Sequence, residues 1–100
     1  MDTITPDQFS AESGVDDWRP GDTGAVAEFR TRNFATGARL FAVIAELAEA
    51  VNHHPDVTVT YPSVRVTLLT HSASGLTAKD VALARQISAA ARELGIEAKV

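Results

Sequence analysis

The hydrophobic pattern of this chain changes its period at a proline, and that change narrows the folds open to it. Before Pro55, apolar residues recur at helical spacing and form one stripe, made of Leu40, Phe41, Ile44, Leu47, Ala48 and Val51. After Pro55 the period becomes two, so that apolar and polar side chains alternate through residues 57–61 and again through residues 64–69. The pattern therefore predicts an amphipathic helix followed by a β-hairpin.

Local signals predict where these elements begin and end. Because the residue before a proline disfavours the α region, we expect the helix to run from about Phe34 to His54. Only Pro62 and Ser63 separate the two alternating stretches, which is the spacing of a tight hairpin connection. A further alternating stretch at residues 25–32 predicts a third strand.

Two capping boxes predict two more helices. The residues Thr5, Pro6 and Gln8 open a short helix that should run to Glu12 or Ser13. A second box opens a final helix at Thr77 and Asp80, which should bury one stripe, made of Leu83, Ile87, Ala90 and Leu94, and end at Gly95. The tail, residues 96–100, is compatible with an extended or a frayed end. Together these elements predict a single α+β domain over residues 1–100, a two-layer structure in which helices pack on one face of an antiparallel sheet. The expected sheet has four strands, three of which the alternating stretches place.

Composition excludes several classes of protein. The chain contains no cysteine, which rules out a disulfide scaffold, a thiolate zinc site and a cysteine nucleophile. A formal net charge of −4 gives no attraction to phosphate backbones or anionic lipid, so neither nucleic acid nor a membrane is an expected partner. The first twenty residues are acidic and lack the features of a signal peptide, so the expected compartment is the cytoplasm.

The histidines are the candidates for chemistry. His53 and His54 stand where the helix is expected to end, where the partial negative charge of the helix terminus favours cations. Imidazole gains and loses a proton near neutral pH, so this position suits acid–base chemistry. Glu49 lies four residues before His53 and could orient its ring from the same helix face, whereas the sequence does not place His71 beside them.

Purely structural roles are open to the same histidines. A His-His-Pro run can cap a helix end by satisfying the terminal carbonyls. Three imidazoles can also hold zinc. Adjacent histidines, however, lie about 100° apart on a helix, unlike the i, i+4 pairs of metal-binding helices, so no metal site is expected.

Other notable residues also have structural alternatives. Asp80 can act only as a capping residue, and Tyr61 can be a core side chain at the end of its strand. Trp18 can plug the core or stack on a flat heterocycle. Three arginines, Arg30, Arg32 and Arg65, are most simply a solvated strand face.

The spacing of the polar residues resembles the signature of a known family. The pattern is Glu49, three residues, His53-His54-Pro55, five residues, Tyr61, nine residues, His71, eight residues and Asp80. It resembles that of the pterin-4a-carbinolamine dehydratases, also called 4a-hydroxytetrahydrobiopterin dehydratases. Residues 34–52 look like the family's central helix, residues 61–71 like its hairpin and residues 75–84 like its final helix.

The resemblance implies a fold, a reaction and roles for these residues. It implies an antiparallel sheet flanked on one side by helices and assembled as a homodimer or homotetramer. The reaction is loss of water from a 4a-hydroxytetrahydropterin to give the quinonoid dihydropterin, in pterin cofactor recycling, with the pterin as substrate and without metal or organic cofactor. By resemblance, His53 and His71 are the acid–base pair and His54 is a substrate-binding and auxiliary catalytic group. The supporting or substrate-binding residues are then Glu49, Pro55, Tyr61 and Asp80.

A second function is compatible with the same fold. Some relatives serve as protein-binding or assembly factors, and those associated with Rubisco assembly lack the catalytic histidines. This chain keeps His53, His54 and His71, which favours the enzyme. A non-catalytic protein-binding factor remains the alternative.

Overall fold

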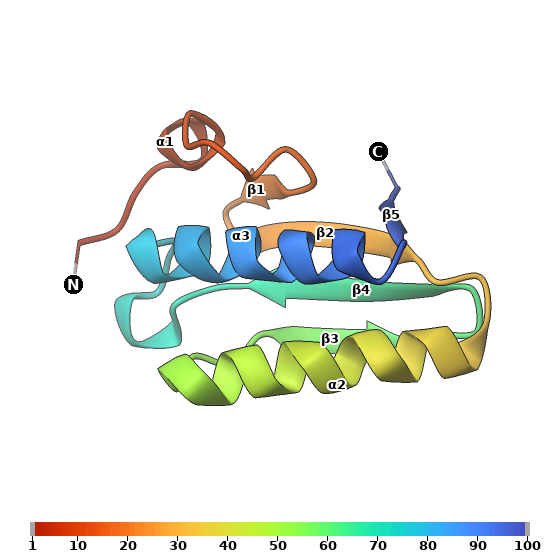
Figure 1. Ribbon diagram of the computed structural model, residues 1–100. Coiled ribbons are helices and arrows are strands. Elements are labelled where there is room, and N and C mark those ends of the chain that lie inside the picture. The colour runs from red at the N-terminus through yellow and green to blue at the C-terminus, as the bar shows by residue number, and fades with distance from the viewer. Residues whose placement is uncertain (1, 100) are drawn as a thin grey trace.

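Helices cover one face of an antiparallel sheet, as the sequence predicts. The computed structural model describes residues 2–99. In chain order its elements are α1 (Pro6–Ser10), β1 (Arg19–Gly21), β2 (Gly24–Arg30), α2 (Phe34–Val51), β3 (Asp56–Val59), β4 (Ser63–Leu68), the 3₁₀ helix η1 (His71–Ala73), α3 (Ala78–Glu93) and β5 (Glu97–Ala98). The strands follow the order β1-β2-β4-β3, and β5 also pairs with β2. The two long helices, α2 and α3, lie side by side on the same face (Figure 1).

The centre of the sheet is the antiparallel pair β2 and β4, whose register fixes which residues face the helices. The pairing runs from Ala25 opposite Leu68 to Arg30 opposite Ser63. Alternate residues of both strands are buried under the helices, namely Ala25, Ala27, Phe29, Val64, Val66 and Leu68. The opposite face is mostly polar, and its arginines, Arg30 and Arg65, are exposed, as is Arg32 beyond β2. The interpretation as a solvated strand face is therefore confirmed for Arg30 and Arg65, whereas Arg32 is exposed but lies outside β2, which ends at Arg30 and not at the expected residue 32.

The β3–β4 connection differs from the predicted two-residue link. β3 ends at Val59 and β4 begins at Ser63, so residues 60–62 form the turn, closed by a 2.9 Å bond from the Thr60 amide to the Ser63 carbonyl. Tyr61 is 69% exposed at the tip of this turn. A core position for Tyr61 is therefore wrong, because strand alternation stops at the last paired residues, Val59 and Val64.

The final helix buries a slightly different stripe from the predicted one. Leu83 and Ile87 are buried as expected, and Ala84, Ser88 and Ala91 join them. Leu94, however, is 41% exposed, because the helix ends at Glu93 and Leu94 leaves its axis as the capping residue. Small side chains at 84 and 91 thus serve the core of the chain itself.

Trp18 fills the core beside this helix. Its indole Nε1 donates a 2.9 Å hydrogen bond to Ser88 Oγ, and its ring packs edge-on against Phe29 with centroids 6.2 Å apart. The side chain is 4% exposed. Of the two roles considered for Trp18, the core plug is confirmed.

The ends of the chain add one strand and shorten one helix. β5 pairs Ala98 with Phe29 and Glu97 with Arg30, so the tail is extended. The sheet has five strands where four were expected, because β1 and β5 both join the three strands that the alternating stretches predict. Val100, the last residue of that tail, lies outside the described residues. The predicted capping box of α1 is present, although the helix ends at Ser10, before the expected Glu12 or Ser13. Among residues 2–99 there is no helix with the length and apolar character needed to cross a membrane.

Candidate functional site

The end of α2 sets the direction of both neighbouring histidines. The helix stops at Val51, three residues before the expected end at His54, because Asn52 adopts the left-handed conformation with φ 49° and ψ 48°. The amide of Asn52 then bonds the Glu49 carbonyl at 3.3 Å, and the amide of His53 bonds the Ala48 carbonyl at 3.1 Å. These two bonds form a Schellman motif, which takes the chain off the helix axis before the imidazoles begin.

This turn carries His53 into the protein interior. Its ring is 9% exposed, and Nε2 lies 2.6 Å from Oδ1 of Asp80, a residue with no exposed surface. The expectation that Glu49 orients the His53 ring is therefore wrong. Pairing at i, i+4 requires the helix to continue to His53, and Asn52 ends it first.

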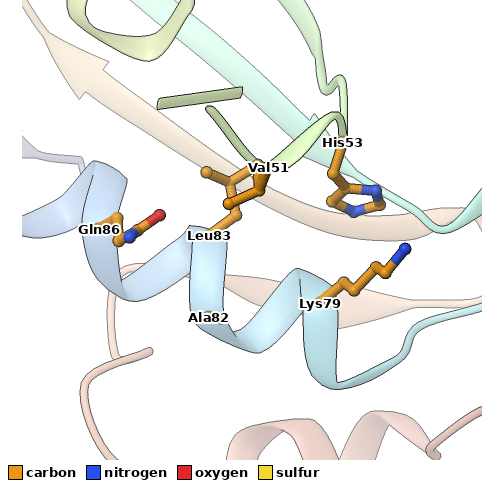
Figure 2. A pocket seen from close by; sticks show the side chains of 6 residues that line it. All are labelled: Val51, His53, Lys79, Ala82, Leu83 and Gln86. Carbon is orange, nitrogen blue, oxygen red and sulfur yellow. The ribbon is translucent and has the colours of Figure 1, made fainter. Parts of the chain in front are cut away.

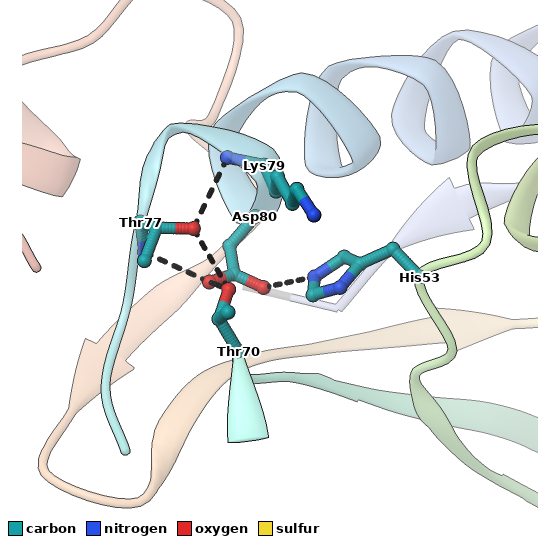
Figure 3. Close-up of polar contacts among 5 residues, drawn as sticks. All are labelled: His53, Thr70, Thr77, Lys79 and Asp80. Atoms are coloured by element: carbon teal, nitrogen blue, oxygen red, sulfur yellow. Dashed lines mark hydrogen bonds and ion pairs between the residues drawn. The ribbon is translucent and has the colours of Figure 1, made fainter. Parts of the chain in front are cut away.

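Asp80 receives hydrogen bonds on both oxygens (Figure 3). Oδ2 accepts from the Thr70 hydroxyl at 2.8 Å and from the Thr77 amide at 2.9 Å, the latter being the capping box of α3. The two threonine hydroxyls lie 2.7 Å apart, and Thr77 Oγ1 also accepts from the Lys79 amide at 3.2 Å. Asp80 thus caps its helix and holds the buried imidazole at the same time.

His54 points away from this cluster. Its Nε2 is paired with Oε2 of Glu49, and both side chains are exposed to solvent. Both residues border a shallow groove of about 300 Å³ together with Phe41 and Pro55. The two adjacent histidines therefore belong to separate surroundings.

A cavity beside His53 lies between the end of α2 and the first turns of α3 (Figure 2). Its volume is about 140 Å³, and its lining residues are Val51, His53, Lys79, Ala82, Leu83 and Gln86. The walls are mainly apolar, and the polar side chains among the lining residues are those of His53, Lys79 and Gln86. Sites for drug-sized ligands are typically about 300–1,000 Å³, so this cavity suits a small molecule or part of one.

The remaining candidate residues lie in other places. His71 is exposed at the start of η1. It directly follows Thr70, whose side chain bonds Asp80, so the main chain of His71 lies at the Asp80 end of the sheet. Tyr61 lies in the β3–β4 turn beside the start of α2, whereas His53 follows the opposite end of that helix (Figure 1). Within one chain the structure therefore brings His53 and Asp80 together, and separates Tyr61 from both.

Sequence reasoning missed the hydroxyl of Thr70. A signal for it exists, because Thr70 continues the buried series Val64, Val66 and Leu68 of β4 and is itself 3% exposed. A polar side chain at a buried strand position needs a buried partner. Among residues 2–99, no group of three or more histidine, aspartate or glutamate side chains is arranged to hold a metal ion.

Comparison with known proteins identifies relatives along most of the chain. The model of the family described as pterin 4 alpha carbinolamine dehydratase matches residues 2–90. Two relatives are both named "Putative pterin-4-alpha-carbinolamine dehydratase". The protein from Chloroflexus aurantiacus is 45% identical, and the match covers 71% of this chain and 76% of that protein. The protein from Mycobacterium leprae is 34% identical, and the match covers 87% of this chain and 94% of that protein. A crystal structure described as a transcriptional coactivator/pterin dehydratase from Brucella melitensis superposes with a TM-score of 0.78 and 32% identity, covering 88% of this chain and 97% of the other.

Proposed function

The chain belongs to the pterin 4 alpha carbinolamine dehydratase family, and from this premise we propose that it dehydrates a 4a-hydroxytetrahydropterin to the quinonoid dihydropterin. The observation that carries the proposal is the buried hydrogen bond between His53 Nε2 and Asp80 Oδ1, at the edge of a cavity. An imidazole fixed on one nitrogen by a carboxylate presents the other, Nδ1, in a defined direction for proton transfer.

The reaction needs one proton donated and one removed. The bond from C4a to its hydroxyl breaks as an acid protonates the oxygen, which leaves as water. A base takes the proton from the neighbouring ring nitrogen, and the freed electron pair forms the C=N double bond of the product. Positioned side chains contribute about 10²–10⁴-fold to such transfers.

We assign these two transfers to His53 and His71, in either order. His53 is supported by its contact with Asp80 and by its place in the cavity wall. His71 is supported by its position, since it follows Thr70, whose side chain contacts the same carboxylate. His54, held by Glu49, borders a separate groove with Pro55, so its substrate-binding role rests on the family resemblance alone. No metal or organic cofactor is part of this proposal, because imidazoles can make both transfers.

The chain is proposed to act as a cytoplasmic homo-oligomer in pterin cofactor recycling. Its large exposed apolar side chains include Phe34 and Phe41, seven residues apart on α2 and 57% and 45% exposed. Residues seven apart share one helix face. A second copy of the chain would cover that face.

A protein-binding role is the second candidate function. The crystallised Brucella relative is described as a transcriptional coactivator as well as a pterin dehydratase. The same face of α2 would then contact a different protein.

A direct assay separates the two functions. The dehydration rate of a freshly generated 4a-hydroxytetrahydropterin is measured with the wild-type chain, with heat-denatured chain and with buffer alone. The dehydratase proposal predicts acceleration by the folded chain only. Equal rates in all three samples would overturn it and favour the protein-binding function.

A further inference from the structure

Thr70 contacts both parts of the proposed site, through different atoms. Its backbone pairs with Gly75, with a 3.0 Å bond from the Thr70 amide and a 3.4 Å bond back to the Thr70 carbonyl. This pair closes the base of the short loop that carries His71. Its side chain turns inward, is buried and reaches Asp80.

The hydrogen bonds around Asp80 can be satisfied in only one direction. An ionised carboxylate accepts and never donates, and a hydroxyl has a single proton to give. Thr70 therefore uses its proton on Asp80 Oδ2, and Thr77 must give its own proton to Thr70 Oγ1, with the Lys79 amide donating to Thr77 in turn (Figure 3). All protons of this chain point towards the carboxylate, and such chains strengthen each bond.

This direction has a consequence for His53. With Oδ2 occupied by two donors, Oδ1 faces His53 Nε2 as an acceptor, so the proton of the neutral ring lies on Nε2. Nδ1 is then the nitrogen left for substrate. The Thr77 amide belongs to the same helix start as Asp80, so it cannot hold the carboxylate relative to the sheet. Thr70, two residues beyond the end of β4, can hold it.

We propose that Thr70 is a positioning residue that aligns the two imidazoles of the site. Its hydroxyl fixes the tautomer and ring direction of His53 through Asp80, and its backbone pair with Gly75 holds the loop of His71. The alignment of an acid with a base rests on the proposed function, whereas the tautomer of His53 can be measured without it.

The test compares three variants with the wild type. Thr70→Val keeps the shape and removes the hydroxyl, and Thr70→Ser restores it. The matched control is Thr31→Val, because Thr31 is 3% exposed and its hydroxyl has no hydrogen-bond partner among the described residues. Each protein is assayed for kcat and KM, and its imidazole ¹⁵N spectrum is recorded.

Thr70→Val should lower kcat by about 10- to 100-fold, the scale of a small misplacement of reacting groups, with KM changed less than about threefold. Its His53 spectrum should change from the Nε2-protonated tautomer to a mixture. Thr70→Ser and Thr31→Val should keep kcat within about twofold, below about 0.5 kcal/mol of barrier, and keep the wild-type spectrum.

The outcomes separate this inference from the proposed function. An active wild type with kcat and the His53 spectrum unchanged in Thr70→Val would overturn the positioning role. A wild type without dehydratase activity, whose His53 spectrum still changes in Thr70→Val, would overturn the proposed function and support the positioning of His53. Should Thr70→Val not fold, the test is made on the wild type by measuring scalar coupling across the hydrogen bond of the Thr70 hydroxyl. Coupling from the Thr70 hydroxyl proton to the Asp80 carboxyl carbon would support donation from Thr70 to Asp80. A Thr70 hydroxyl proton bonded to Thr77 would contradict it.

Discussion

His53 and His54 are adjacent in the chain, yet their imidazoles contact different carboxylates, Asp80 and Glu49. The first pair is buried and the second is exposed. Exposed ion pairs contribute about 0–1 kcal/mol to stability, whereas removing one partner of a buried pair leaves a desolvated polar group and costs more. The two histidines should therefore respond differently to substitution.

Replacement of His71 and of His53 should separate activity from stability. His71→Ala removes an exposed imidazole and should lower the dehydration rate about 10²–10⁴-fold while the free energy of unfolding changes by less than about 0.5 kcal/mol. His53→Ala should lower the rate similarly and destabilise the fold by about 1–3 kcal/mol, because Asp80 loses a donor. Ser72→Ala, beside His71, is the control. Rates within about twofold of wild type in both histidine variants would refute their catalytic assignment.

Asp80→Asn should lower the specific activity of the folded protein, in addition to lowering its stability through the weakened helix cap. The amide keeps one acceptor oxygen but turns a donor towards one of the groups that now donate to Asp80, so the free energy of unfolding should fall by about 1–3 kcal/mol. Gln8→Ala removes the corresponding bond from the capping box of α1, far from His53, and should affect stability alone. Should Asp80→Asn melt much earlier while the folded protein keeps its specific activity, Asp80 is a cap and no more.

Removal of metal ions should leave the activity unchanged. The proposed chemistry uses imidazoles for both proton transfers. Chain purified through a strong chelator and assayed in metal-free buffer should match the untreated protein. Loss of activity on chelation with recovery on adding zinc would establish a metal requirement.

Self-association should depend on α2 and not on α3. Ala84 and Ala91 of α3 are buried within the chain, so this side of α3 is not available to a second copy. Light scattering at micromolar concentration should give a dimer or tetramer, and Phe41→Glu should dissociate it. Ala89→Glu, on the exposed side of α3, is the matched control. A fully active monomer would contradict the proposed assembly.

The fold follows from patterns that depend on local sequence, and these are the parts predicted well. The helical stripe before Pro55 and the alternation after it predict α2, β3 and β4, and the capping boxes predict α1 and α3. The two-residue β5 has no such pattern, because its pairing with β2 depends on a distant strand. The sequence therefore predicts the layers better than the strand count.

The site was predicted as a set of residues but not as a set of contacts. Whether Glu49 or Asp80 holds His53 depends on a single left-handed residue, Asn52. A Pro-based rule predicts a helix end near it but cannot give the turn by which the chain leaves the helix. The separation of Tyr61 from His53 likewise depends on the length of the hairpin turn and the direction of α2.

Trp18, the only tryptophan of the chain, provides a built-in optical probe for all of these experiments. Its indole is shielded from water and donates a hydrogen bond to Ser88, which lies 70 residues later in the chain. Its fluorescence emission therefore reports whether the N-terminal segment remains packed on α3. A variant that loses activity with a wild-type emission maximum has lost chemistry, and one whose emission shifts to the red has lost its structure. Fluorescence of a single residue thus distinguishes a damaged site from a damaged fold without any label.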